Sequence, residues 1–396
     1  MVSPSSSASI TRDWEALAID LLGCIARRLP LVDYIRFRFV CTSWANAASP
    51  QNGLCTLLTP NKPHLLLPAA EEGDGSESCT LLSLSDKQCH HTSPLPEISS
   101  KVVIGSQYGW LITCDEILNL GLLNPITRAQ SQLPSLTTVA SLETVYGPDG
   151  TVSYFRHHDH TGSEICVVPA KNCQQCSISK ITLSSSPSSG NYSAAAIFVL
   201  RKLIFTTEGM GHWAELDVGY FHDVKYHQGK FVAVSVDGEV IAIDINGLCF
   251  EIMHIAKVFD SHPDEFMYLA TLFGDLLLVS KSGMWISVPE GDGAVIPGAI
   301  KIMRLDPEEG TWTPVVSLGG YSLLLDCGPV AFLARDIPGL RENCIYFLYY
   351  EYDWKRESFI CRVGEFSLED GHIRQCHQLD ALRKRPTPTW IVPTVP

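Results

Sequence analysis

Histidines and cysteines gather between residues 157 and 176, and both side chains are common zinc ligands. In order they are His157, His158, His160, Cys166, Cys173 and Cys176, the last two forming a Cys-x-x-Cys pair. Such a pair can chelate one zinc ion when a second, regularly spaced pair of ligands completes the site. No second pair follows, so we favour a polar surface hairpin and predict no metal and no other cofactor. A metal-dependent enzyme is the less favoured alternative.

A second group of residues could transfer protons. His222, Asp223 and His227 are close in sequence, and imidazole with carboxylate is a common acid–base pair. They lie at the entrance to an expected strand, so we assign them to turn and edge hydrogen bonds. The chain also has no Gly-x-Ser-x-Gly, His-Glu-x-x-His, P-loop or dinucleotide motif. We therefore predict no catalytic residue and a protein that is not an enzyme.

The composition limits the partners. The 396 residues carry a net charge of −14, and 45% of them are hydrophobic. Nucleic acids and anionic membranes require a basic surface, so we expect neither, and a protein or neutral ligand is favoured. The 14 cysteines form no regular framework and no secretory segment follows Met1. The sequence therefore predicts a soluble protein of the cytoplasm, the nucleus or both.

Apolar residues near the N-terminus recur with a helical period. One stripe consists of Leu22, Ile25, Ala26 and Leu29, and a second consists of Tyr34, Phe37, Cys41 and Trp44. This spacing predicts two or three short helices between residues 11 and 50. A unit of roughly 40 residues is near the size below which a chain usually needs a partner. The alternative is a helical hairpin that packs on the rest of the protein.

This segment resembles an F-box, the module that docks a substrate receptor onto the Skp-type adaptor of a cullin–RING ubiquitin ligase. The matching elements are Leu17, Asp20-Leu21-Leu22, Ile25, Leu29, the helix from Asp33 to Arg38, and Val40-Cys41-x-x-Trp44. Ala18 stands where the family usually has proline, and Thr42 and Ala45 replace basic residues. The resemblance implies that the adaptor binds Leu17, Leu21, Leu22, Ile25, Leu29, Leu31, Val40, Cys41 and Trp44.

From residue 57 onward, short β-branched or aromatic runs alternate with turn residues. The segment 229–238 recurs as 274–283, with both of its glycines displaced by 45 residues. A repeat of about 40–50 residues is typical of one propeller blade. We predict an all-β propeller of six to seven blades over residues 57–392, with a sandwich and barrel as the alternative fold.

Four motifs in this region resemble the KIB-type β-propeller domain, which commonly follows an F-box in plants. They are Asn124-Pro125-Ile126-Thr127-Arg128, Asp223-Val224-x-Tyr226-His227-x-Gly229-Lys230-Phe231, Gly274-Asp275-Leu276-Leu277-Leu278-Val279, and Thr311-Trp312 with Ser317-Leu318-Gly319. The resemblance implies a substrate receptor of a ubiquitin ligase and leaves the substrate open.

We therefore expect a disordered N-terminus (1–10), an F-box (11–50) and a propeller (57–392). The F-box would dock the adaptor of a Skp–cullin–F-box ligase, and the propeller would bind a protein substrate. The alternative is a propeller scaffold whose diverged F-box no longer binds an adaptor. Aromatic residues dominate interface hot spots, and the candidates in loop-like segments are Tyr108, Trp213, Tyr220, Trp285 and Trp354.

Overall fold

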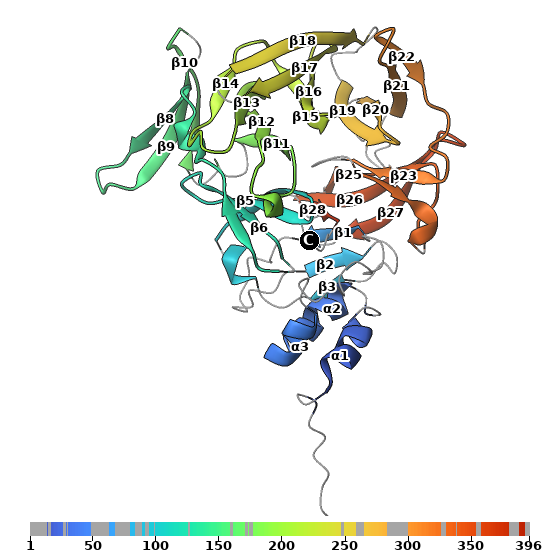
Figure 1. Cartoon of the computed structure of the whole chain (residues 1–396). Helices are drawn as coiled ribbons and strands as arrows, with labels where there is room; N and C mark the ends of the chain where they lie inside the picture. The colour runs from blue at the N-terminus through green and yellow to red at the C-terminus, as the bar shows by residue number, and fades with distance from the viewer. Residues whose placement is uncertain are drawn as a thin grey trace, which may run out of the picture. The chain divides into compact units, whose positions relative to one another are not determined.

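The structure is a computed structural model of the chain. It describes residues 14, 17–26, 29, 31–48, 63–67, 80–83, 89–91, 95–98, 100–125, 127–158, 161–170, 173, 177–246, 249–258, 265–282, 300–325, 330–337, 339–353, 358–379 and 388–392. These residues fall into two compact units, one within Met1–Lys62 and one within Pro63–Thr394. The first is the helical unit and the second is the propeller (Figure 1).

Three short helices form the helical unit, as the apolar stripes predicted. They are α1 (Ile19–Ala26), α2 (Leu31–Arg38) and α3 (Thr42–Ala47). Their core includes Leu22, Phe37 and Ala47, which are all buried. The Trp44 ring lies 4.4 Å from the Phe37 ring, centroid to centroid, and its indole nitrogen donates to the carbonyl of Trp14 at 3.0 Å. Trp44 therefore holds α3 against α2. None of the helices in the described part of the chain combines the length and the apolar content that a membrane crossing requires.

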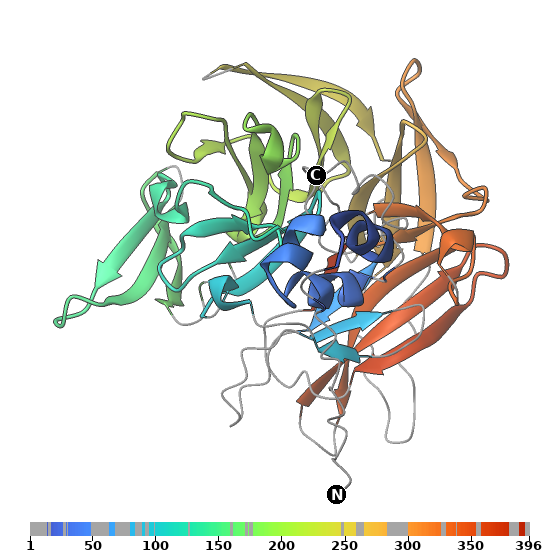
Figure 2. The ribbon, with the colours of Figure 1, turned by 60° about the horizontal axis from the view of Figure 1, so that its bottom comes forward.

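In the described part of the propeller, six of the sheets form blades, and they are arranged around a ring (Figures 1 and 2). From the innermost strand outward, blade 1 is β28 (Thr389–Ile391), β1 (His64–Leu67), β2 (Thr80–Ser83) and β3 (Cys89–His91). Blade 2 is β4 (Val102–Gln107), β5 (Trp110–Cys114), β6 (Leu120–Leu123) and β7 (Gln130–Gln132). Blade 3 is β11 (Ile178–Leu183), β12 (Ala194–Phe198), β13 (Lys202–Thr206) and β14 (Ala214–Leu216).

The remaining blades follow the same antiparallel plan, except that β23 and β25 of blade 6 pair in parallel. Blade 4 is β15 (Phe221–His227), β16 (Lys230–Ser235), β17 (Glu239–Asn246) and β18 (Cys249–Lys257). Blade 5 is β19 (Glu265–Leu272), β20 (Asp275–Ser282), β21 (Ile300–Asp306) and β22 (Thr311–Pro314). Blade 6 has five strands, β24 (Val330–Leu333), β23 (Tyr321–Leu324), β25 (Cys344–Asp353), β26 (Ser358–Ser367) and β27 (Ile373–Leu379).

Buried apolar side chains join each blade to the next. Separate clusters link blades 2 and 3, 3 and 4, 4 and 5, and 5 and 6. Another cluster joins Phe332 and Tyr346 of blade 6 to Leu65 and Trp390 of blade 1. Ser106 of blade 2 donates to the carbonyl of Trp390. The C-terminal strand β28 thus closes the ring, because it completes the blade that β1 begins.

The repeat in the sequence corresponds to one hairpin in successive blades. Gln228-Gly229 and Phe273-Gly274 connect the first and second strands of blades 4 and 5, and all four residues have positive φ. Two consecutive residues of positive φ define a type I′ turn, which matches the twist of a tight hairpin. Gln228 donates to the carbonyl of Gly274 at 3.2 Å, so neighbouring turns lie together. These turns mark the hairpin end of the ring.

A seventh sheet lies outside the ring. It consists of β8 (Leu142–Tyr146), β9 (Val152–His158) and β10 (Glu164–Pro169), in the order β10-β9-β8. This inserted sheet connects blades 2 and 3, whose inner strands β4 and β11 contact each other directly. Its three strands stand away from the six blades in both views (Figures 1 and 2). The described residues therefore form six blades and one inserted sheet.

Candidate functional site

Several apolar side chains of the helical unit are exposed. Leu21 on α1 is 56% exposed, Ile25 on α1 is 41% exposed, and Val40 after α2 is 55% exposed. Ile19 and Phe39 are exposed to a similar extent, although neither is among the predicted adaptor contacts. Because Ile19 and Phe39 are close in sequence to Leu21 and Val40, they could have been included in the prediction. We use the name apolar face of the helical unit for this set of exposed residues, Ile19, Leu21, Ile25, Phe39 and Val40, of which Leu21 and Ile25 lie four residues apart on one side of α1.

The other residues expected to contact the adaptor are less accessible. Leu22 is fully buried and belongs to the core of the helical unit. Leu17, Leu29, Cys41 and Trp44 are partly buried, and Cys41 is the N-cap residue of α3. Leu31 begins α2, but its side chain lies outside the described residues. The adaptor contacts of all these residues stay a prediction.

The aromatic residues proposed to bind a substrate do not come together. Trp213 is 1% exposed, and its indole nitrogen donates to the carbonyl of Pro134 at 2.8 Å. It therefore packs within the protein instead of facing a partner. Tyr108 lies in the turn between β4 and β5, at the hairpin end of the ring. Tyr220 precedes the first strand of blade 4, so it is exposed at the opposite end of the ring. Trp285 and Trp354 lie outside the described residues.

The histidines and cysteines considered as zinc ligands have separate surroundings. The buried His157 ring lies 5.4 Å from the Phe198 ring, whereas the His158 Nε2 lies 3.1 Å from a Glu143 carboxylate oxygen. Burial, with a smaller contribution from the charge of His158, lowers the pKa of His157 to about 4. Across the described ranges no group of three or more candidate ligands surrounds a common point. His160 and Cys176 lie outside those ranges.

Two of the residues considered for proton transfer, His222 and Asp223, are held in contacts between blades. Asp223 is buried, forms an ion pair with Lys180 of blade 3, and accepts the backbone N–H of Leu269 in blade 5 at 2.7 Å. His222 lies beside Arg201, 2.6 Å from Nη1 to Nδ1. Burial and, to a lesser degree, this guanidinium lower the pKa of His222 to about 4. The carboxylate of Asp223 therefore joins three blades from a buried position, instead of making the turn and edge hydrogen bonds that we expected.

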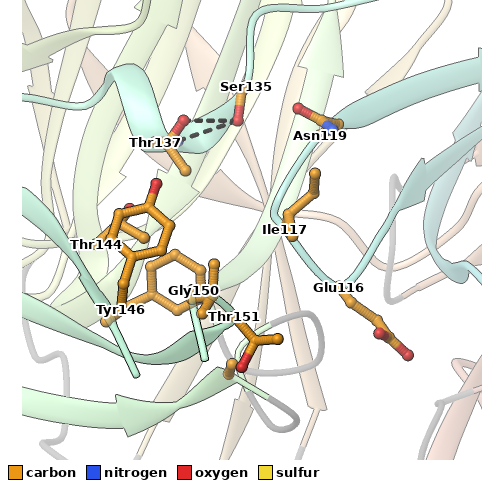
Figure 3. Close-up of a pocket in the computed structure, with 12 residues that line it drawn as sticks. Glu116, Ile117, Asn119, Ser135, Thr137, Thr144, Tyr146, Gly150 and Thr151 are labelled. Carbon is orange, nitrogen blue, oxygen red and sulfur yellow. Dashed lines mark hydrogen bonds between the residues drawn. The ribbon is translucent and has the colours of Figure 1, made fainter. Parts of the chain in front are cut away.

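A cleft of about 760 Å³ lies between the inserted sheet and blade 2. Its size is typical of ligand-binding pockets, at about 300–1,000 Å³. Thr144 and Tyr146 line one side, and the turn between β5 and β6 lines the other with Glu116 and Ile117 (Figure 3). Further lining residues include Asn119, Ser135, Thr137, Thr151, Val152 and Phe155. Sequence reasoning missed this site because nothing distinguishes these common residues from those of ordinary turns.

Comparison with known proteins identifies both units. The F-box domain model matches residues 14–54, and the KIB1-4 beta-propeller model matches residues 81–373. F-box protein KIB4 of Arabidopsis thaliana is 22% identical over 384 residues, which cover 90% of this chain and 88% of that protein. F-box protein SKIP23 of the same plant is 23% identical over 414 residues, covering 96% and 95%. Among solved structures, TolB from Acinetobacter baumannii is 11% identical to this chain, and the match covers 89% of this chain and 72% of TolB. Its TM-score of 0.37 is too low to support a conclusion.

Proposed function

The chain belongs to the KIB1-4 β-propeller family and carries an F-box, and from this premise we propose that it is the substrate-recognition subunit of a Skp–cullin–F-box ubiquitin ligase. The apolar face of the helical unit binds a Skp-type adaptor. The propeller binds a protein substrate. The observation that carries the proposal is the combination of an F-box whose apolar side chains are exposed with a closed propeller in the same chain.

The proposed adaptor contact rests on burial of apolar surface. A large apolar side chain that becomes fully buried contributes about 1.5–3 kcal/mol. Leu21 and Val40 are each more than half exposed, so both can lose most of their contact with water in a complex. Because only about half of each side chain remains to be buried, together they contribute about 1.5–3 kcal/mol, which is a factor of roughly 10–150 in affinity. This is enough to decide whether the adaptor binds.

The chain performs no bond chemistry in this proposal. A receptor that holds a substrate beside a ubiquitin-loaded enzyme raises the effective concentration of the substrate's lysines near the thioester. Correct orientation then converts an encounter in solution into an effectively unimolecular step. The propeller suits this role because its core, built from inter-blade clusters, gives a rigid body on which the loops and the inserted sheet are placed.

Adaptor binding tests the proposal. Full-length chain should form a one-to-one complex with a Skp-type adaptor, and a Leu21→Asp/Val40→Asp variant should bind at least about tenfold more weakly. The matched control is Val316→Asp, because Val316 is a highly exposed valine in the propeller. Trp44→Ala would be a poor test, since it removes the contact with Phe37 that holds α3 in place. A wild-type chain that fails to bind any Skp-type adaptor would favour the scaffold alternative.

A further inference from the structure

The inserted sheet creates the cleft because its inner face is only partly covered. Leu142 and Phe155 on this face are buried in the core shared with blades 2 and 3. Toward the tip of the β8–β9 hairpin the same face carries Thr144, which is partly exposed, and Tyr146, which is 64% exposed. Opposite them Ile117 is 52% exposed on the β5–β6 turn. The cleft therefore presents two accessible apolar groups, Tyr146 and Ile117, on facing walls (Figure 3).

The strand that borders the cleft has an unpaired edge. Among the strands that the structure describes, β8 of the inserted sheet pairs with β9 on one side and with none on the other. An antiparallel strand with one neighbour directs the N–H and C=O of every second residue away from the sheet. Thr144 and Tyr146 line the cleft and belong to this strand. An extended peptide can therefore add a strand to β8 while its side chains enter the cleft, a common mode of peptide recognition.

The described charged residues in the β5–β6 and β8–β9 turns beside the cleft are acidic. Among the described residues that line the cleft, Glu116 is charged, and none is a lysine or an arginine. Asp115 precedes Glu116, and its carboxylate accepts the backbone N–H groups of Ile117 and Asn119. At the hairpin tip the exposed Asp149 accepts hydrogen bonds from Thr151, which lower the pKa of its carboxyl. These three carboxyl groups favour a ligand with positive charge.

We propose that this cleft binds an extended, lysine- or arginine-containing segment of a protein, which pairs with the edge of β8. One apolar side chain of the segment lies between Tyr146 and Ile117, and a cationic side chain reaches Glu116. This inference rests on the proposed function, because we take the bound segment to belong to a substrate of the ligase. It places substrate recognition on the inserted sheet instead of on the aromatic residues at the two ends of the ring.

Selection from a peptide library tests this site without requiring the substrate itself. A phage library of random peptides, about 12 residues long, is selected against immobilised full-length chain, and the affinity of the enriched peptides is measured by fluorescence anisotropy. We expect peptides with alternating apolar residues and lysine or arginine. Tyr146→Ala and Glu116→Lys should each weaken binding by about tenfold or more. Hydrogen exchange at the amides of β8 should slow when the peptide binds.

The control for charge is Glu308→Lys, because Glu308 is an exposed glutamate on the turn between β21 and β22, remote in the blade order from blade 2. It should leave peptide affinity unchanged. Tyr146 and Glu116 are exposed, so both variants should unfold at the wild-type temperature, and a lost peptide signal would report on binding. Absence of enrichment, enrichment of acidic peptides, or enriched peptides that bind both variants with wild-type affinity would overturn the proposal.

These outcomes are separate from those of adaptor binding. A chain that binds the peptides at the cleft but no Skp-type adaptor would retain this site and lose the proposed ligase role. A chain that binds the adaptor but yields no cleft peptides would retain the ligase role and refute this site.

Discussion

Replacing Trp390 by alanine should destabilise the whole propeller, because this residue contacts three blades. It lies in the innermost strand of blade 1, is 5% exposed, and packs with Leu65 of its own blade and with Phe332 and Tyr346 of blade 6. Its backbone carbonyl accepts the hydroxyl of Ser106 in blade 2. If β28 closes the ring, loss of this indole weakens the packing between blades 1 and 6, whereas the backbone carbonyl that accepts Ser106 is retained.

The size of the effect follows from the burial of the side chain. Truncation of a buried tryptophan to alanine typically costs about 3–5 kcal/mol. Proteins unfold with an entropy of about 2.1 cal/mol/K per residue near 60 °C, so a propeller of roughly 330 residues should lose about 4–7 °C in melting temperature. Trp390→Phe keeps much of the apolar contact and should lose less than half as much.

Thermal unfolding of the full chain, followed by circular dichroism in the near ultraviolet, would measure these shifts. The matched control is Trp312→Ala, because Trp312 is a half-buried tryptophan on β22, the outermost strand of blade 5. Its loss should lower the melting temperature by a smaller amount. Equal shifts for both alanine variants, or a shift below about 1 °C for Trp390→Ala, would refute ring closure by β28.

Three further predictions concern individual positions. A Cβ on Gly364 would lie 2.6 Å from Cζ of Phe347, so Gly364→Ala should lower the free energy of unfolding by about 1–3 kcal/mol or more. In urea titrations, adding Phe347→Leu to the Gly364→Ala chain should recover part of the lost stability. Gly274 has a φ of 89° with open space around the position of a Cβ; Gly274→Ala should therefore cost about 1–2 kcal/mol from backbone strain alone, and an unchanged urea midpoint would contradict the assigned turn. Folding lowers the pKa of His157 from 6.5 to about 4, so between these pH values the unfolded chain binds more protons than the folded protein. The stability of the fold should therefore fall by up to about 3 kcal/mol as the pH is lowered from 6.5 to about 4. Urea titrations between pH 4.5 and 7.5 should show a smaller loss in His157→Gln, whereas His254→Gln, at an exposed histidine, should match wild type.

The sequence predicts the repeating part of the propeller because each hairpin is specified locally. Gly229 and Gly274 lie in left-handed backbone that glycine adopts without strain, and apolar strands follow them. The closing strand is different. β28 has only three residues and pairs with β1, more than 300 residues away in the chain. No local pattern specifies such a long-range contact, so the blade count could be predicted only as a range.

The inserted sheet could not be distinguished from a blade for a related reason. Asp149-Gly150 is a typical hairpin dipeptide, and Gly150 indeed has a φ of 80° and lies between β8 and β9. Whether that hairpin joins the ring depends on the direct contact between β4 and β11, which is a tertiary feature. The cleft depends on the same contact, because the inserted sheet faces blade 2 only when it lies outside the ring.

Aromatic residue type alone does not show whether a side chain is buried or exposed. Trp213 and Tyr220 both occupy loop-like segments, yet Trp213 is buried against Pro134 and Tyr220 is 54% exposed. An aromatic ring has the same sequence signature in an inter-blade contact and on a free surface. In the helical unit the apolar period correctly predicted the helices, but it could not show that Leu22 faces the core while Leu21 faces solvent.

Ubiquitin transfer in a reconstituted system tests the central claim most directly. The full chain is assembled with a Skp-type adaptor, a cullin, a RING subunit and the ubiquitin-activating and ubiquitin-conjugating enzymes, and is then incubated with the proteins that its propeller retains from an extract. Mass spectrometry quantifies ubiquitin-modified lysines for wild type, for Leu21→Asp/Val40→Asp and for Val316→Asp. We expect at least one retained protein to be modified by wild type and by Val316→Asp, and to stay bound but unmodified with the Leu21→Asp/Val40→Asp variant. No modification with wild type, or equal modification with the Leu21→Asp/Val40→Asp variant, would contradict the account.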